Sequence, residues 1–324
     1  MNGVLVIDKP AGWTSHDVVN RLRRILQQRS VGHLGTLDPL ATGVLPLVTG
    51  SFTRLAQFYT TSEKSYEGAI RFGFSTDTYD AEGTPVGAAT QVNLALEELR
   101  SLAAQFRGAI EQMPPPFSAK KIHGVPAYKL ARKQKEVVLK PVQVEVKEFE
   151  ILSVDADRAH FRARVASGTY MRSVAHDLGQ RLGCGAHLES LRRTAVAEFT
   201  LVDAHTLEEL ENQRHPDRNF AFPQEEGSAV DGPGAASPNH ASLEDLFVHP
   251  RKVLPDLPSV TADEANVARI RTGRTVNLPE LSRARQVKVF SGQRELIAIA
   301  TRVAGTLFHP RIVLCGADTA VGRF

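Results

Sequence analysis

Asp38 is the residue of this sequence whose setting best suits catalysis. It lies in the loop 32–43, GHLGTLDPLATG, between Leu37 and Leu40. The three glycines of this loop let the backbone approach a ligand closely. A carboxylate in such a place can act as a nucleophile or stabilise a cationic sugar centre. Taken alone, Leu-Asp-Pro is more often a simple turn, so the loop by itself leaves catalysis and turn formation both open.

The Asp38 loop is the second of six short motifs that follow one another along residues 3–202. In type and order these motifs resemble the TruB family of tRNA pseudouridine synthases. A set of six in one order is far more specific than any single match. The other five are KPAGWTS (9–15), KSY (64–66), MPPPFSA (113–119), GTYMR (168–172) and HLESLRRT (187–194).

This resemblance implies an isomerase that converts uridine to pseudouridine in the T loop of tRNA, at position 55. Asp38 matches the catalytic aspartate of the family, and Arg172 matches the arginine that pairs with it through a planar guanidinium. Tyr66 matches the tyrosine beneath the target base, where its ring can stack and its phenol can reach C5. No cofactor is implied. The eleven histidines show no HExxH or similar spacing, so no metal site is predicted.

RNA contacts are expected at several places outside this catalytic set. A base inside a folded RNA loop must be flipped out to be reached. Residues 120–140, within a basic insertion at 113–141, hold seven lysines or arginines and one acid, so we expect phosphate contacts there, although a solvated basic loop has the same composition. Lys9, with Pro10, is also expected to support the catalytic loop. The residues that we assign to substrate or RNA binding are His33, Lys9, Lys120, Lys121, Tyr128, Lys133, Arg192 and Arg193.

Helical and strand-like patterns alternate along the chain without a regular strand–helix repeat. This favours an α+β fold with a mixed, largely antiparallel sheet over a doubly wound parallel sheet, and the resemblance implies the pseudouridine synthase fold. We predict helices from Val18 to Leu26, at Leu94–Phe106, at Arg172–Leu182 and at Asp263–Thr272. The predicted strands are 3–7, 44–48, 66–72, 142–154, 160–165, 286–290, 295–301 and 311–314.

Three parts of the chain differ in composition. Residues 1–202 carry the motifs and form the predicted catalytic domain. Residues 203–258 form an acidic, partly disordered linker, in which 203–246 holds ten acidic and two basic residues and 212–241 is rich in proline and poor in aliphatic side chains. Residues 259–324 form a small C-terminal β-barrel that resembles the RNA-binding PUA domain of the family.

The overall composition indicates a soluble cytoplasmic protein. Apolar residues make up 42% of the 324, which is enough for a sizeable core. Two cysteines without a CxxC pair argue against a disulfide framework or a cysteine zinc site. No stretch reaches the roughly 18 apolar residues of a membrane span, and no signal peptide is recognised. The net charge of +3 hides a strongly basic body, which suits a polyanionic partner.

Two alternative functions stay open. A guide-RNA-dependent synthase of the dyskerin type would share the Asp38 loop, but the basic insertion equips this chain to hold RNA unaided. A non-catalytic tRNA-binding or tRNA-folding chaperone would not need Asp38, Tyr66 and Arg172 together. A glycosidase would need a second placed carboxylate. We therefore predict a stand-alone monomer that acts on the T arm of tRNA and needs no protein partner.

Overall fold

The computed structural model describes residues 1–117, 121–122, 125–126, 140–214 and 242–314. Its larger sheet has the strand order β14-β1-β3-β12-β4-β11-β10-β7, with β2 beside β3 and β13 beside β12. Only β1–β14 and β3–β12 are parallel among the described pairs of this sheet, so the predicted mixed, largely antiparallel sheet is confirmed. Its strands are β1 Gly3–Lys9, β2 Val31–His33, β3 Thr42–Thr49, β4 Lys64–Phe72, β7 Gly108–Gln112, β10 Val142–Asp155, β11 Arg158–Val165, β12 Ala186–Val196, β13 Phe199–Thr200 and β14 Ala204–His205.

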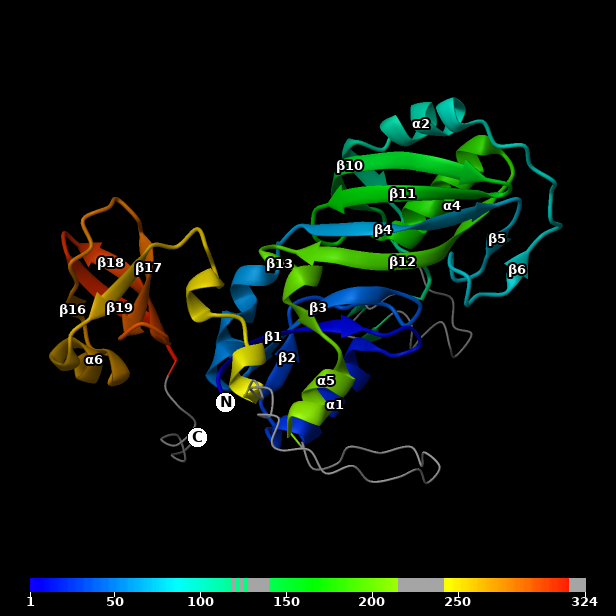
Figure 1. Cartoon of the computed structure of the whole chain (residues 1–324). Coiled ribbons are helices and arrows are strands. Elements are labelled where there is room, and N and C mark those ends of the chain that lie inside the picture. The colour runs from blue at the N-terminus through cyan, green and yellow to red at the C-terminus, as the bar shows by residue number, and fades with distance from the viewer. Residues whose placement is uncertain (118–120, 123–124, 127–139, 215–241, 315–324) are drawn as a thin grey trace, which may run out of the picture.

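Four helices pack on this sheet and bury one face of it (Figure 1). Their buried residues join a single hydrophobic cluster with alternating residues of β1, β3, β4, β10 and β11. The first helix begins at Ser15, three residues before the predicted Val18, because Thr14 and Asp17 form a capping box. The helices are α1 Ser15–Leu26, α2 Leu96–Ala104, α4 Met171–Leu182 and α5 Leu207–Arg214.

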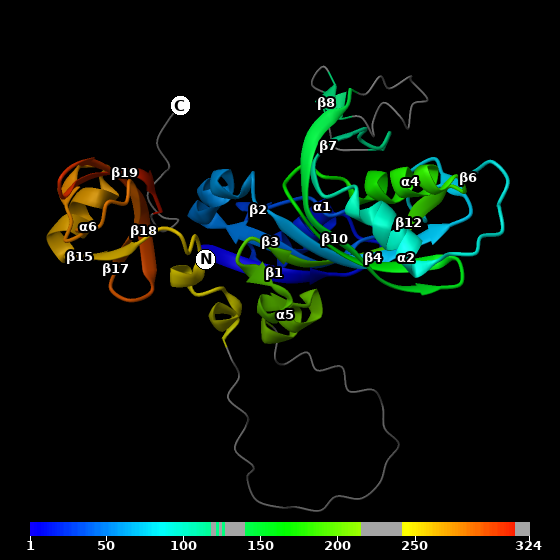
Figure 2. The ribbon, with the colours of Figure 1, turned by 90° about the horizontal axis from the view of Figure 1, so that it is seen from above.

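Several smaller elements were not predicted. A 3-10 helix, η1 Gly50–Tyr59, connects β3 to β4, and a short hairpin, β5 Ser75–Thr76 with β6 Pro85–Val86, follows β4. Strand β10 curves away from the body toward β7 and toward β8 Lys121–Ile122, which pairs with β9 Val125–Pro126 (Figure 2). The rest of the basic insertion lies outside the described residues.

The packed unit around the large sheet extends beyond residue 202, the predicted end of the catalytic domain. Strand β14 pairs with β1 at the edge of the large sheet, and Leu210 in α5 is fully buried in the main cluster. Arg21 of α1 also pairs with Glu211. We therefore place the end of this unit at Arg214. The expectation of disorder from residue 212 was wrong for 212–214, because they complete α5. Residues 215–241 lie outside the described residues.

A second, curled sheet forms the C-terminal part, as expected for a PUA-like domain. Its order is β15-β17-β18-β19-β16. Helix α6 Glu264–Arg271 is capped by Asp263, in agreement with the prediction. The last predicted strand was too short, and β15 and β16 were missed because they span only four and two residues. The strands are β15 Ser259–Ala262, β16 Val276–Asn277, β17 Gln286–Ser291, β18 Glu295–Ala304 and β19 Leu307–Val313.

The C-terminal sheet packs against the end of the large sheet where the N-terminus lies (Figure 1). Phe290, Ile299 and Ile312 share a hydrophobic cluster with Val4 and Phe52. The buried ammonium of Lys288 adds polar contacts, since it donates to the carbonyls of Arg251 and Val253 in the connecting segment. None of the described helices is long and apolar enough to cross a bilayer.

Candidate active site

The three predicted catalytic residues meet at one cavity. It has a volume of about 300 Å³ and lies between the Asp38 loop, strand β4 and the turn that leads into α4. Tyr66 lines it from β4 and is 8% exposed. The lining residues are Gly35, Thr36, Leu37, Asp38, Thr60, Lys64, Tyr66, Val165, Ala166, Ser167, Gly168, Thr169, Tyr170, Met171, Arg172, Leu191 and Arg193.

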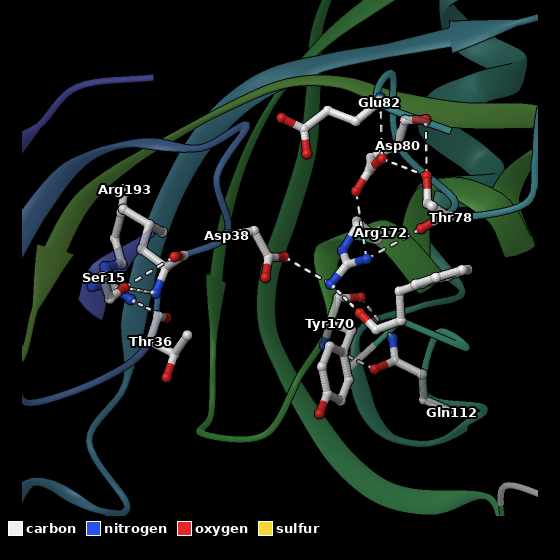
Figure 3. A network of polar contacts seen from close by, with 12 residues as sticks. Ser15, Thr36, Asp38, Thr78, Asp80, Glu82, Gln112, Tyr170, Arg172 and Arg193 are labelled. Atoms are coloured by element: carbon white, nitrogen blue, oxygen red, sulfur yellow. Dashed lines mark hydrogen bonds and ion pairs between the residues drawn. The ribbon is translucent and has the colours of Figure 1, made fainter. Parts of the chain in front are cut away.

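Arg172 forms an ion pair with Asp38, as the resemblance implied. Its Nη2 lies 2.9 Å from Oδ2 of Asp38 (Figure 3). The side chain of Asp38 is 40% exposed, whereas that of Arg172 is 7% exposed. The arginine therefore lies beneath the carboxylate, which keeps one side open to the cavity. A guanidinium in this place holds the carboxylate in one orientation.

A second carboxylate, Asp80, shares this arginine. Its Oδ2 lies 3.4 Å from Nη1 of Arg172, and the side chain is almost completely buried. Arg172 also donates hydrogen bonds to two backbone carbonyls, from Nη1 to Thr78 at 3.2 Å and from Nη2 to Phe117 at 3.1 Å. Sequence reasoning missed Asp80 because an acid in the polar turn 77–83 has the pattern of an ordinary turn residue.

The turn that carries Asp80 is firmly held. The Thr78 hydroxyl donates to Oδ1 of Asp80 at 2.5 Å, and the Glu82 N–H donates to the same oxygen at 3.1 Å (Figure 3). The ring of Tyr79 stacks on His176 of α4, with centroids 3.8 Å apart. Burial and the nearby carboxylates of Asp80 and Asp38 raise the pKa of Glu82. These contacts fix Asp80 relative to the helix that begins with Arg172.

Lys9 supports the catalytic loop and is not placed for a direct RNA contact. Its side chain is fully buried, and its ammonium donates to the carbonyls of Pro10, Trp13 and Pro39 at 2.8, 2.6 and 3.3 Å. Burial lowers its pKa to about 8. The expected supporting role fits this geometry. The expected substrate contact does not, because the charged group faces backbone carbonyls instead of solvent.

Arg193 is also turned inward, contrary to the expected RNA contact. It is 1% exposed and donates to the carbonyls of Val44, Thr36 and Gly35 at 2.8, 3.0 and 3.1 Å. Its neighbour Arg192 points to the other side of β12, where it pairs with Asp8 and stays 42% exposed. Successive residues of a strand face opposite sides, so only Arg192 remains accessible.

Ser15 adds a third buried tie to the catalytic loop. The Leu37 N–H donates to the Ser15 hydroxyl at 2.8 Å, and this hydroxyl donates to the Leu37 carbonyl at 3.0 Å. Figure 3 shows Ser15 and Arg193 together beside Thr36. The loop that carries Asp38 is thus held by three side chains from two other parts of the chain, Lys9 and Ser15 near the N-terminus and Arg193 on β12, which keeps the carboxylate in place before substrate binds.

The inward orientation of Arg193 leads to a stability prediction. Arg193→Met is expected to lower the free energy of unfolding by roughly 2–4 kcal/mol, because three carbonyls near the loop lose their donor. Arg192→Met is the matched control and should cost much less, since its ion pair is partly exposed. Urea unfolding of both variants measures this. Equal losses, or a loss of tRNA affinity alone for Arg193→Met, would contradict the structural role.

The other predicted RNA-binding residues are placed less completely. His33 lies at the end of β2, outside the lining of the cavity, and its Nδ1 accepts from the Gly35 N–H. Burial lowers the pKa of His33, and the nearby charges of Arg193 and His16 lower it further. Lys121 lies in β8, and nothing is described of its side chain. Lys120, Tyr128 and Lys133 lie outside the described residues.

Lys64 lines the cavity although no role was assigned to it from the KSY motif. It precedes Tyr66 by two residues on β4. Burial and the nearby Arg193 lower its pKa to about 8.

Among the described residues, no group of three or more His, Cys, Asp or Glu could hold a metal ion.

Comparisons with known proteins show which families and structures this chain resembles. Residues 23–171 match the family model described as TruB family pseudouridylate synthase (N terminal domain), and residues 172–221 match the tRNA pseudouridylate synthase B C-terminal domain. A relative from Solibacter usitatus (strain Ellin6076), named tRNA pseudouridine synthase B, is 48% identical over 97% of this chain and 100% of its own. A relative of the same name from Aquifex aeolicus (strain VF5) is 45% identical over 67% of this chain and 76% of its own.

Solved structures share the fold. A Cbf5-Nop10-Gar1 complex contains a chain with a TM-score of 0.67 and 23% identity, covering 98% of this chain and 86% of that one. An H/ACA RNP bound to a substrate RNA containing 2'-deoxyuridine contains a chain with the same TM-score and 22% identity. At this level of identity the likeness is one of fold alone, and it extends over both sheets.

Proposed function

Because the chain belongs to the TruB family of pseudouridine synthases, we propose that it isomerises the uridine at position 55 in the T loop of tRNA, as a stand-alone enzyme. Conversion of uridine to pseudouridine in tRNA is the activity that the curated relatives carry in their name. The observation that supports it in this chain is the Asp38–Arg172 ion pair at the cavity. An oriented, partly exposed carboxylate is what the sugar chemistry requires.

The reaction can be followed in terms of the residues at the cavity. The flipped nucleotide places its base against Tyr66 and its C1′ near Asp38. The C1′–N1 bond breaks with its electron pair leaving on the uracil, and Asp38 either bonds to C1′ or stabilises its positive charge. The uracil then turns and C5 joins C1′. If Asp38 had bonded to C1′, that bond breaks in this step and its electron pair returns to the carboxylate. The proton on C5 leaves and N1 gains one, so atoms balance without a co-reactant.

Arg172 and Asp80 have a positioning role in this proposal. Arg172 keeps Asp38 oriented, and Asp80 fixes the other arm of the guanidinium. Because both lie beneath Asp38 and are nearly buried, they act through it and not on the sugar. The loop ties of Lys9, Ser15 and Arg193 serve the same end.

Several residues are proposed to hold the tRNA. The insertion at 113–141 would contact phosphates. Arg192, the accessible arginine of the HLESLRRT motif on β12, would add a further contact. The C-terminal sheet adds a hollow lined by Arg285, His309 and Arg311, and cations of this kind suit a phosphate backbone. We propose the PUA-like part, residues 259–324, as a second RNA-binding unit joined to the catalytic unit by the acidic linker.

The partners and location follow from the same proposal. We propose that the chain acts as a monomer in the cytoplasm, without a protein partner or guide RNA. The curated relatives, at up to 48% identity over nearly the whole chain, favour this over a dyskerin-type subunit. The matching chains of the solved structures are only 22–24% identical and support the fold.

Tritium release tests the function directly. The purified chain is mixed with transcribed tRNA that carries tritium at C5 of its uridines, without guide RNA. One equivalent of tritium per tRNA is expected, because one C5 proton leaves for each pseudouridine formed. Replacing U55 by cytidine in the tRNA should abolish release. Release only after adding guide RNA and partners would favour the dyskerin-type subunit, and binding without any release would favour a chaperone.

A further inference from the structure

Three cationic side chains line the active-site cavity, and two of them already contact several other protein groups. The terminal nitrogens of Arg172 contact two carboxylates and two carbonyls. Arg193 donates to three carbonyls. Lys64 differs from both. An ammonium has three N–H donors, and among the described residues only the Ser62 carbonyl accepts one, at 2.6 Å.

The strand geometry turns Lys64 toward the cavity. Residues two apart in a strand share a side, so Lys64 and Tyr66 both face the cavity from β4. The residue before it, Glu63, faces the other way, where it contacts Lys147 and Arg164 on the charged outer side of the sheet. Lys64 therefore lies on the wall where a base stacked on Tyr66 would present an edge.

We propose that the Lys64 ammonium donates a hydrogen bond to a carbonyl oxygen of the target uracil and stabilises its negative charge as the C1′–N1 bond breaks. The inference rests on the proposed function. The bond's electron pair moves into the uracil ring and its carbonyl oxygens, and Lys64 stays protonated throughout. When C5 bonds to C1′, the pair enters the new bond and the contact weakens. Lys64 thus stabilises the separated, negatively charged uracil more than the uracil that is joined to the sugar.

A charge in this position has a large effect because the wall of the cavity is partly desolvated. Donors aimed at a developing negative charge act with little competition from water, and removing one commonly costs about 10²–10³ in rate. The lowered pKa of Lys64 reflects the same desolvation. A contact with a phosphate would instead contribute to the affinity for tRNA. The experiment therefore measures both the reaction rate and the tRNA affinity.

Single-turnover rates with saturating enzyme test the proposal. Lys64→Met keeps the length of the side chain without the charge, and it should slow tritium release by about 100-fold while tRNA affinity stays within about threefold. Lys64→Arg should recover most of the rate. Lys147→Met is the matched control, on the outer side of the sheet, and should match the wild-type chain. Wild-type release in the same assay shows separately that the proposed function holds.

The pH dependence gives a second readout that a merely structural role would not move. The charged or titratable groups that share the cavity with Lys64 are Asp38 in the loop, Tyr66 on β4, Tyr170 at the start of α4, Arg172 on α4 and Arg193 on β12. Strand β11 contributes Val165. Since Lys64 has a lowered pKa of about 8, the wild-type rate should fall as pH rises through that region. Lys64→Arg should not fall there, because a guanidinium stays protonated.

Three outcomes would overturn the proposal. The first is a wild-type single-turnover rate for Lys64→Met. The second is a loss that lies entirely in tRNA affinity, which would assign Lys64 to a phosphate. The third is an alkaline fall that is the same in Lys64→Arg. If Lys64→Met melts well below the wild-type chain, the comparison of Lys64→Arg with wild type across pH decides alone.

Discussion

Asp38→Asn is expected to abolish isomerisation while leaving tRNA affinity within about tenfold of the wild-type chain, because phosphate contacts supply most of that affinity. The amide has nearly the same shape as the carboxylate and can still accept from Arg172. It carries no negative charge, so it can neither bond to C1′ as a nucleophile nor stabilise a cationic sugar. Tritium release and filter binding on the same preparation measure both quantities.

The control for this variant is Asp8→Asn. Asp8 pairs with Arg192 away from the cavity, so this change removes an aspartate charge and an ion pair without touching the site. Its turnover should stay close to that of the wild-type chain. Turnover by Asp38→Asn well above background would rule out Asp38 as the essential carboxylate, and would also remove the basis for the Arg172 assignment.

Arg172→Ala should both slow the reaction by at least about 100-fold and lower the free energy of unfolding by about 3–5 kcal/mol. The loss of stability comes mainly from Asp80, which is 4% exposed and would keep a buried charge without its partner. The loss of rate comes from Asp38, which would no longer be held. Single-turnover kinetics and urea unfolding separate the two effects.

Two further variants identify the cause of each loss. Arg172→Lys restores the positive charge but cannot reach both carboxylates with one planar group, so it should recover stability better than rate. Adding Asp80→Asn to Arg172→Ala removes the unpaired charge, and it should recover part of the stability without restoring activity. An Arg172→Ala chain with the wild-type rate would show that Asp38 does not depend on this ion pair.

The three residues proposed for catalysis could be recognised in the sequence because their signals are local. Asp38, Tyr66 and Arg172 each lie in a short motif, and the motifs occur in one order along residues 3–202. Strong local patterns also predicted α1, α4 and α6, whose hydrophobic spacing and capping residues lie within one or two turns. Alternation likewise predicted β10 and β11, although their ends shifted by a residue or two.

The elements that were missed have weak or long-range signals. Strand β14 is only two residues long and forms because β1 offers it an edge. Helix α5 was taken for linker because a highly charged segment can look unstructured, and its single buried residue, Leu210, finds its place only in the folded core. A domain boundary read from motifs therefore came before the true end of the packed unit.

The sequence alone identifies the residues that we propose to carry the chemistry, because their identity and spacing are enough to mark them. The tertiary structure decided which charged side chains face the substrate. Lys9 and Arg193 are residue types that often contact RNA, yet their side-chain nitrogens donate hydrogen bonds to buried backbone carbonyls. Asp80 has the pattern of a turn acid, yet it holds Arg172. The side to which a charged side chain points depends on its position in the alternating pattern of its strand and on its hydrogen-bond partners. Those partners lie far along the chain, and only folding brings them together.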